Sequence, residues 1–247
     1  MSEGELMMIV AAAREIADGE TVFVGMRRPM LAFALAQRLH APSAVGLYEN
    51  GIVRQRPTTP VARTMGDPRM TAGATWVGGM ATVMGLLAQG HVDLGLLGAG
   101  QVDRFGNLNS SYIGDYARPE RRLPGSGGSS DITSLAKRCV VLLPHQPQRL
   151  VEAVDYLTAP GHGSGSGWRD GVGLPATSAG TTVVVTDLAV LRADAEGELW
   201  LTALHAGATV EAVQAATGWP LKISDALRQS AAPTEEECAA LAALRQG

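Results

Sequence analysis

Apolar residues recur along the chain in two spacings, one typical of helices and one of buried strands. The first residues carry apolar side chains at helical spacing, and Ser2 with Glu5 has the spacing of a capping box. Asp18-Gly19 predicts the end of this helix, and short apolar runs then predict strands. The predicted order after that helix is strand 21–25, helix 29–40, strand 44–49, helix 80–90, strands 92–100, 138–144, 181–192 and 198–205, and helices 210–217 and 233–245.

This alternation of strands and helices predicts βαβ units, and therefore an α/β fold built on a parallel sheet. The runs 181–192 and 198–205 are close enough to pair as a hairpin across 193–197. Thr234 and Glu237 give the last helix a second capping box. Because no repeat or linker divides the chain, we expect a single domain over residues 1–247.

Two segments do not follow either spacing. Residues 101–132 and 159–175 are polar and rich in glycine. Loops of this length inside a compact domain are usually functional or disordered.

Composition excludes several classes of protein. The chain has 247 residues, of which 46% are hydrophobic and 18% charged, as in ordinary globular proteins. The net charge of −4 and the scattered basic residues argue against binding to nucleic acid or to an anionic membrane. Cys139 and Cys238 are expected to be buried or inert, which fits a reducing cytoplasm. Acidic residues precede the first apolar stretch, unlike a signal peptide, and no apolar run is long enough for a membrane span.

Several familiar motifs fail on inspection. Gly98-Ala99-Gly100 follows a strand, but Asp103 stands where a dinucleotide-binding fingerprint needs its third glycine. The five histidines are scattered without metal-ligand spacing. We therefore expect no metal site.

Glu49 ends the strand-like run 44–49 and is followed at once by Asn50-Gly51. A lone glutamate at such a turn most often faces water and caps the strand. However, ligands of parallel α/β sheets bind beyond the carboxyl ends of strands, and a carboxylate held there can act as a base or a nucleophile. The residues alone leave both interpretations open.

The stretch "LPGSGGSSDI", residues 123–132, is a second candidate. Gly125, Gly127 and Gly128 leave backbone N–H groups uncovered, and such groups can bind a developing oxyanion or a phosphate. The alternative is an ordinary glycine-rich turn.

The stretch "YENG", residues 48–51, resembles the Glu-Asn-Gly element of class I CoA-transferases. The whole chain resembles the smaller, β-type subunit of the glutaconate CoA-transferase group. This resemblance implies a three-layer α/β/α fold with a mostly parallel sheet, an α-type partner subunit and an active site between the subunits. It also implies acyl-CoA and carboxylate substrates, with no tightly bound cofactor. The stretches that carry it are 41–51, 94–132, 153–161, 184–191 and 207–221.

Carried over residue by residue, the resemblance makes Glu49 the covalent nucleophile. The other site residues implied by it are Ser126, Gly127 and Gly128 in the oxyanion and CoA-binding loop, and Gln101 and Asn109 near the acyl or pantetheine portion. Two departures stand out: Tyr48 before the glutamate, which bears on substrate fit, and Ser129-Ser130 after the glycines.

Two alternatives to a transferase remain. One is an acyl-CoA hydrolase or lyase on the same scaffold, although those relatives typically lack the glutamate. The other is a non-catalytic small-molecule-binding subunit. Dicarboxylic or 3-oxo acids are the expected acid substrates, and the sequence does not name them.

Overall fold

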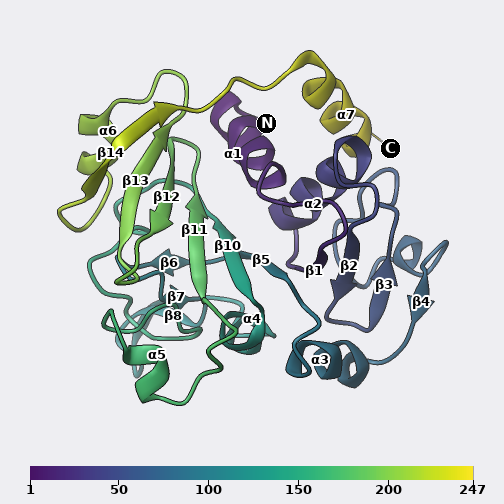
Figure 1. Ribbon diagram of the computed structural model, residues 1–247, viewed down its shortest axis with the longest axis horizontal. Helices are drawn as coiled ribbons and strands as arrows, with labels where there is room; N and C mark the ends of the chain where they lie inside the picture. Colours follow the sequence, from purple (N-terminus) through teal and green to yellow (C-terminus); the bar gives the residue numbers. More distant parts are fainter. Residues whose placement is uncertain (247) are drawn as a thin grey trace.

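The structure is a computed structural model that describes residues 1–246. A mixed ten-stranded sheet runs through the molecule (Figure 1). Its strands, in spatial order, are β14 (Lys222–Gln229), β13 (Leu199–Leu204), β12 (Ala189–Ala193), β11 (Thr181–Val185), β10 (Arg138–Leu142), β5 (Leu94–Gly98), β1 (Thr21–Val24), β2 (Val45–Tyr48), β3 (Ile52–Arg54) and β4 (Trp76–Val77).

The centre of the sheet is parallel. Strands β2, β1, β5, β10 and β11 are neighbours in that order, and each pair between them is parallel. Their carboxyl ends therefore share one edge of the sheet, called here the carboxyl edge, and their first residues share the opposite amino edge. Strands β3, β4, β12 and β13 extend the sheet on both sides with antiparallel pairings.

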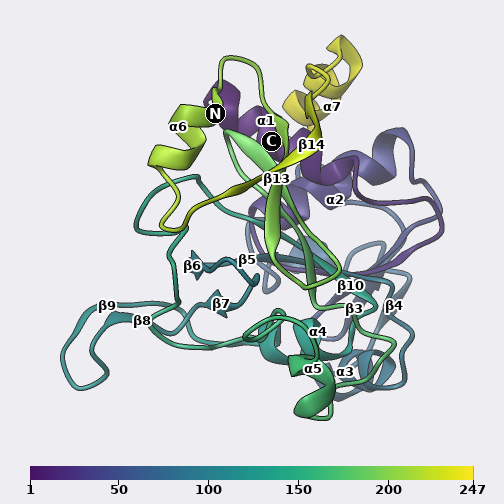
Figure 2. The same cartoon turned by 60° about the vertical axis from the view of Figure 1, so that its left-hand side comes forward.

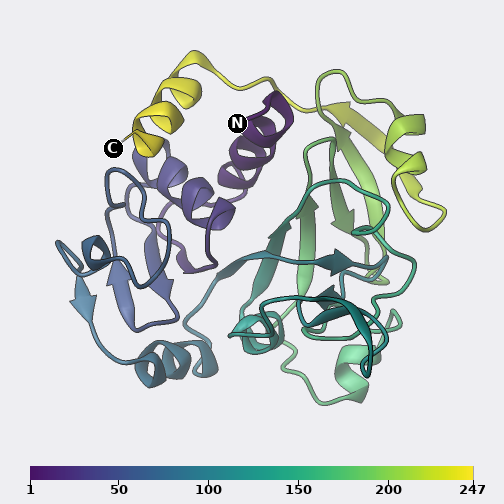
Figure 3. The same ribbon diagram turned by 180° about the vertical axis from the view of Figure 1, so that it is seen from behind.

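Helices cover both faces of the sheet. The helices are α1 (Glu3–Ala13), α2 (Arg28–Leu39), α3 (Met80–Ala88), α4 (Ser129–Leu135), α5 (Trp168–Gly171), α6 (Val210–Ala215) and α7 (Glu235–Arg245), with a 3-10 turn η1 (Pro68–Met70). One apolar cluster joins α1, α2 and α7 to one face, and a second joins α3, α4 and α6 to the other. Figures 1 and 3 show α1, α2 and α7 grouped on one side of the molecule, away from α3 and α4. The predicted three-layer α/β/α fold is confirmed.

The predicted order departs from the structure in several places, because β3, β4 and β14 lie outside the predicted strands and one predicted strand is divided in two. Residues 181–192 form two antiparallel strands, because the chain turns back at Thr186, whose hydroxyl accepts hydrogen bonds from the N–H groups of Leu188 and Ala189. Strand β14 was not predicted, since its residues are mostly exposed and polar and show no apolar alternation. The predicted hairpin across 193–197 is present as β12 and β13.

The first irregular segment is structured. It contains β6 (Gln101–Val102) paired with β7 (Leu108–Asn109), β8 (Tyr112–Gly114) paired with β9 (Pro119–Arg122), and then α4. Figure 2 shows the β8–β9 hairpin extending away from the body of the protein. The second irregular segment contains the short helix α5.

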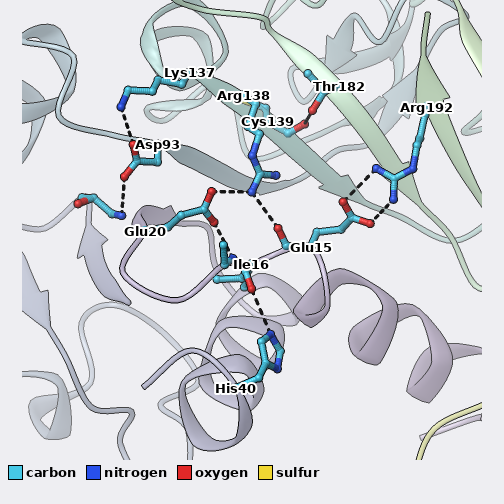
Figure 4. A network of polar contacts seen from close by, with 12 residues as sticks. Glu15, Ile16, Glu20, His40, Asp93, Lys137, Arg138, Cys139, Thr182 and Arg192 are labelled. Carbon is cyan, nitrogen blue, oxygen red and sulfur yellow. Dashed lines mark hydrogen bonds and ion pairs between the residues drawn. The ribbon is translucent and has the colours of Figure 1, made fainter. Parts of the chain in front are cut away.

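Ion pairs hold α1 and the following loop to the amino edge (Figure 4). Glu20 binds Arg138 at 2.7 Å, and Glu15 pairs with Arg192. Asp93 binds Lys137 at 2.6 Å and also accepts a hydrogen bond from the N–H of Thr21. Each of these cations therefore has a carboxylate partner, which fixes the starts of β1, β5 and β10.

Of the two predicted capping boxes, only the one at Thr234 is reciprocal, because the Glu5 carboxylate accepts a hydrogen bond from Arg28 instead of from Ser2. The Ser2 hydroxyl accepts a hydrogen bond from the N–H of Glu5, and Thr234 with Glu237 forms the reciprocal capping box of α7. Among residues 1–246, no helix combines the length and the apolar character that crossing a membrane requires.

Candidate active site

A tight turn carries Glu49 at the carboxyl edge. Tyr48 pairs with Ile52 across β2 and β3, and Glu49, Asn50 and Gly51 form the loop between them. The N–H of Gly51 donates to the carbonyl of Tyr48 at 2.8 Å, and Gly51 has a φ of +97°. This is the three-residue hairpin loop in which a left-handed residue, usually glycine, follows a turn.

Only glycine fits at position 51. A methyl group there would lie 2.4 Å from the carbonyl oxygen of Gly78, whose own N–H donates to the Gly51 carbonyl at 2.9 Å. The turn is thus locked against the segment that follows β4. Because its backbone is fixed on both sides, the Glu49 side chain starts from a defined position.

The two residues before Glu49 pack into opposite layers. Leu47 lies in the apolar cluster that contains α3 and α4, whereas Tyr48 lies in the cluster of α1 and α2. Tyr48 is 4% exposed, and burial raises the pKa of its phenol well above the usual range. Tyr48 therefore acts as a core residue on the other face, which argues against the expectation that it bears on substrate fit.

The structure brings Glu49 against the glycine-rich loop. A methyl group built on Gly127 would lie 3.3 Å from Oε2 of Glu49, and one built on Gly128 would lie 3.5 Å from the same oxygen. Gly127 has a φ of +47°, and Gly128 is the N-cap of α4. Side chains at these positions would crowd the carboxylate, so the loop leaves open backbone next to it.

Ser126 is exposed at the start of this turn. Its carbonyl accepts hydrogen bonds from both the N–H and the hydroxyl of Ser129, at 3.0 and 2.7 Å. Ser129 thus closes the turn that presents the glycines, which gives a structural role to one of the two serines that depart from the family pattern.

The other end of α4 is clamped from the amino edge. Arg169 donates to the carbonyls of Thr133 at 3.2 Å and Gly161 at 2.7 Å, and the Ser178 hydroxyl also donates to Thr133 at 3.4 Å. Burial lowers the pKa of Arg169, whose charge is compensated by these carbonyl dipoles. Sequence reasoning missed Arg169, although it is the only Lys or Arg within the glycine-rich stretch 159–175.

Gln101 and Asn109 form a buried pair. The Asn109 amide donates to Oε1 of Gln101 at 2.7 Å, and its oxygen accepts from the N–H of Ser111 at 2.9 Å. The two side chains are 3% and 0% exposed. They hold segment 110–111, to which the glycine-rich loop is bound through the N–H of Gly125 and the carbonyl of Ser110 at 2.7 Å. Their contact with substrate stays a prediction.

Comparison with known proteins shows which family of proteins the chain resembles in sequence and structure. Residues 5–216 match the coenzyme A transferase family. The chain is 38% identical to the B-type subunit of 3-oxoadipate CoA-transferase from Pseudomonas knackmussii, over 96% of this chain and 91% of that one. It is 31% identical to the B-type subunit of glutaconate CoA-transferase from Acidaminococcus fermentans, over 91% and 86%. The crystal structure of that organism's glutaconate CoA-transferase superposes with a TM-score of 0.90 at 28% identity, covering 96% and 92% of the chains.

The chain belongs to the coenzyme A transferase family.

Family membership confirms the fold and the class of enzyme predicted from "YENG" and the stretches around it. The roles of individual residues are a separate matter and stay predictions. Within residues 1–246, no group of three or more histidine, cysteine, aspartate or glutamate side chains is placed to hold a metal ion.

An exposed apolar surface adjoins the Glu49 turn in this coenzyme A transferase chain. Residues 70–92 contain no Asp, Glu, Lys or Arg, and in α3 only Val83 and Leu87 are buried. Trp76, Val77 and Met80 are 45%, 53% and 58% exposed. We call residues 74–82 the α3 face. Contiguous apolar surface of this kind marks a site of contact with another molecule.

Proposed function

We propose that this chain is the β-type subunit of a heteromeric CoA-transferase, which moves CoA between an acyl-CoA and a free dicarboxylic or 3-oxo acid. The observation that carries the proposal is the carboxylate of Glu49 lying against the open backbone of Gly127 and Gly128 on a locked turn. A nucleophile and a set of oxyanion donors need this proximity in order to act on one carbonyl.

The reaction begins with attack by a Glu49 oxygen on the thioester carbonyl of the acyl-CoA. The C–S bond breaks, which gives a mixed anhydride on Glu49 and CoA thiolate. The thiolate then attacks the Glu49 carbonyl, releases the first acid as a carboxylate and leaves CoA on the enzyme as a glutamyl thioester. The second acid reverses these steps, so the exchange is ping-pong and needs no external energy source.

Backbone donors supply the main stabilisation. Each tetrahedral intermediate carries an oxyanion, and a preorganised donor is typically worth about 3–4 kcal/mol to such a species. The N–H groups of Gly127 and Gly128 are the proposed donors, with Ser126 at the rim of the loop. Gln101 and Asn109 are proposed to hold the neighbouring segment in place. Substitution of each residue tests whether it also contacts the acyl or pantetheine portion of the substrate.

The α3 face is the proposed seat of an α-type partner subunit. The anhydride must be kept from water, and Glu49 is only partly buried in the isolated chain. The α3 face joins the Glu49 turn directly through the hydrogen bond between Gly78 and Gly51. A partner seated there would cover the apolar side chains and close the catalytic turn at the same time. Both relatives are named as one subunit of a CoA-transferase, which supports an enzyme built from more than one kind of chain.

Trapping the covalent intermediate tests the function. The chain is purified together with its α-type partner and incubated with succinyl-CoA, and the peptide that contains Glu49 is then analysed by mass spectrometry. A mass increase equal to CoA less one water, as a thioester requires, is expected, and it should disappear with hydroxylamine or with an acceptor such as 3-oxoadipate or glutaconate. CoA release in water alone, without any acceptor acid, would identify a hydrolase instead. No adduct and no turnover with any thioester would identify a non-catalytic subunit.

A further inference from the structure

One residue at the carboxyl edge has a backbone conformation that its type rarely adopts. Arg27 has a φ of +67° and is the only non-glycine residue among 1–246 with a positive φ. Its ψ of −111° lies outside the usual left-handed region, and its side chain forms no cap for α2. Such a conformation is strained, and strained residues of this kind concentrate at functional sites.

Strand register places Arg27 close to Glu49. Phe23 pairs with Leu47 in the parallel ladder of β1 and β2, so Gly25 comes level with Glu49 two residues later. Arg27 follows after two more residues, which span at most about 7 Å. Val24 also pairs with Leu96 of β5, so the chain after β1 runs beside the segment that follows β5.

Two further arginines approach the same segment from other elements. The Arg149 guanidinium reaches the carbonyl of Gly100 at 3.4 Å. A methyl group on Gly100 would lie 2.4 Å from the side chain of Leu123, which directly follows β9, the strand that carries Arg121. Burial lowers the pKa of Arg149, and the charges of Arg121 and Arg28 lower it further, in keeping with the placement of these cations along the carboxyl edge.

These cations are short of carboxylate partners. Arg28 pairs with Glu5 at 2.8 Å, whereas Arg27, Arg121 and Arg149 take part in no ion pair among residues 1–246. Clustered like charges repel, and the cost falls when an anion binds between them. Arginine is also the side chain best suited to hold a carboxylate or phosphate group through two parallel hydrogen bonds.

We propose that Arg27, Arg28, Arg121 and Arg149 form a subsite for an oxyanion of the substrate next to Glu49. This subsite, the basic edge, rests on the proposed function. Its ligand is a carboxylate or phosphate group with two possible sources: the remote carboxylate of a dicarboxylic acid, or the phosphates of CoA. A glycine would fit the backbone at position 27 better than an arginine. The strain is therefore the cost of having a charged side chain there.

Steady-state kinetics of the reconstituted complex test the basic edge. The variants are Arg27→Gly, Arg121→Gln and Arg149→Gln, and the matched control is Arg104→Gln, an exposed arginine that lies over Phe105 instead. KM is measured for a dicarboxylic and a monocarboxylic acceptor, and for succinyl-CoA and succinyl-pantetheine. An increase in KM of about tenfold that is confined to the dicarboxylic acid shows that the subsite binds the remote carboxylate of that acid. The same increase confined to succinyl-CoA assigns the phosphates.

Arg27→Gly separates this role from a structural one. Relief of the positive φ should raise Tm, while KM for the assigned substrate rises. A higher Tm with all KM values unchanged would remove Arg27 from the subsite. KM values that match Arg104→Gln in every variant would overturn the proposal, as would loss of co-purification with the α-type partner, because the cluster would then be a subunit contact.

A binding experiment without catalysis keeps the two proposals separable. Adipate and pyrophosphate are titrated into the purified complex, and Tm is followed. A rise in Tm for the wild-type chain that the triple variant lacks supports the basic edge even if no transfer activity is found. If transfer activity is found, but neither the wild-type chain nor the triple variant shows a Tm response and the KM values are unchanged, the proposed function holds and the subsite is refuted.

Discussion

The two edges of the central sheet differ in how far their charged side chains are paired with opposite charges. At the amino edge, Arg138 and Arg192 are each paired with a glutamate (Figure 4). At the carboxyl edge, Glu49 has no ion-pair partner among residues 1–246, nor do Arg27, Arg121 and Arg149. Paired charges stabilise the fold, whereas unpaired charges held at fixed positions are available to a ligand. The comparison teaches that paired charges at one edge hold the sheet together, whereas the unpaired charges at the other edge are the ones that we propose bind substrate.

Helix α4 connects the two edges. Its N-cap, Gly128, lies beside Glu49, and the carbonyl of Thr133 near its other end is held by Arg169 and Ser178. The position of the proposed oxyanion donors therefore depends on hydrogen bonds made far from the reacting atoms.

The largest expected effect comes from comparing two glutamates, one at each edge. Glu49→Ala should lower CoA transfer by more than about a thousandfold, because it removes the nucleophile, with stability changed by about 0.5 kcal/mol or less. Glu20→Ala should keep transfer and lose about 1–2 kcal/mol of stability, since it leaves Arg138 unpaired. Activity assays and urea denaturation of both variants check this. Near-normal turnover by Glu49→Ala would refute the nucleophile assignment.

Next in size is the effect of one methyl group in the glycine-rich loop. Gly127→Ala places a methyl group 3.3 Å from Oε2 of Glu49 and should lower turnover about a hundredfold. Gly125→Ala is the matched control, because Gly125 also has a positive φ but has nothing within 4 Å of the added methyl group. Both should lose about 1–2 kcal/mol of stability. Equal turnover losses would show that backbone strain, and not contact with Glu49, is responsible.

A smaller effect should follow from loosening α4. Arg169→Met removes the guanidinium donor to the carbonyls of Gly161 and Thr133 and leaves Thr133 only the longer bond from Ser178, so kcat should fall about tenfold while KM stays within about twofold. Arg192→Met, at the amino edge, should lower the free energy of unfolding about as much as Arg169→Met does, but it should leave kcat unchanged. Urea denaturation measures the stability loss and initial rates measure the catalytic one. Parallel changes in the two variants would mean that Arg169 is structural only.

The smallest effect concerns pH. Burial raises the pKa of Asp93, but hydrogen bonds from Lys137 and the N–H of Thr21 outweigh it and hold the pKa below its ordinary value of 3.8. A depressed pKa stabilises the folded state above pH 3.8, and this contribution is lost as pH falls through the folded value. Asp93→Asn should therefore lower the urea midpoint near neutral pH, and its difference from the wild-type chain should shrink as the pH falls below 3.8. A constant difference across this range would contradict the assignment.

Much of the fold could be predicted because its signals are local. The helix caps at Ser2 and Thr234, and the short apolar runs of β1, β2, β5 and β10, can be recognised in the sequence without any tertiary contact. Where the prediction failed, the signal was non-local. The turn at Thr186 interrupts a run of apolar residues, and β14 takes its strand conformation from pairing with β13.

The candidate site divides in the same way. Glu49 was found because it ends an apolar run on an Asn-Gly turn, and the glycines at 125–128 were found from composition. Arg169, Arg149 and Arg121 were not, because an arginine in a polar or glycine-rich segment has no sequence spacing that distinguishes a surface charge from one that binds backbone or substrate.

By itself, the sequence determined most of the helices, the strands at the centre of the sheet and their parallel arrangement, and that a carboxylate ends β2. The tertiary structure alone decided that Gly127 and Gly128 lie against that carboxylate and that the Arg149 guanidinium reaches the carbonyl of Gly100. The physical reason is that strand order and loop packing depend on contacts between residues far apart in the chain, whereas spacing and capping depend on neighbours.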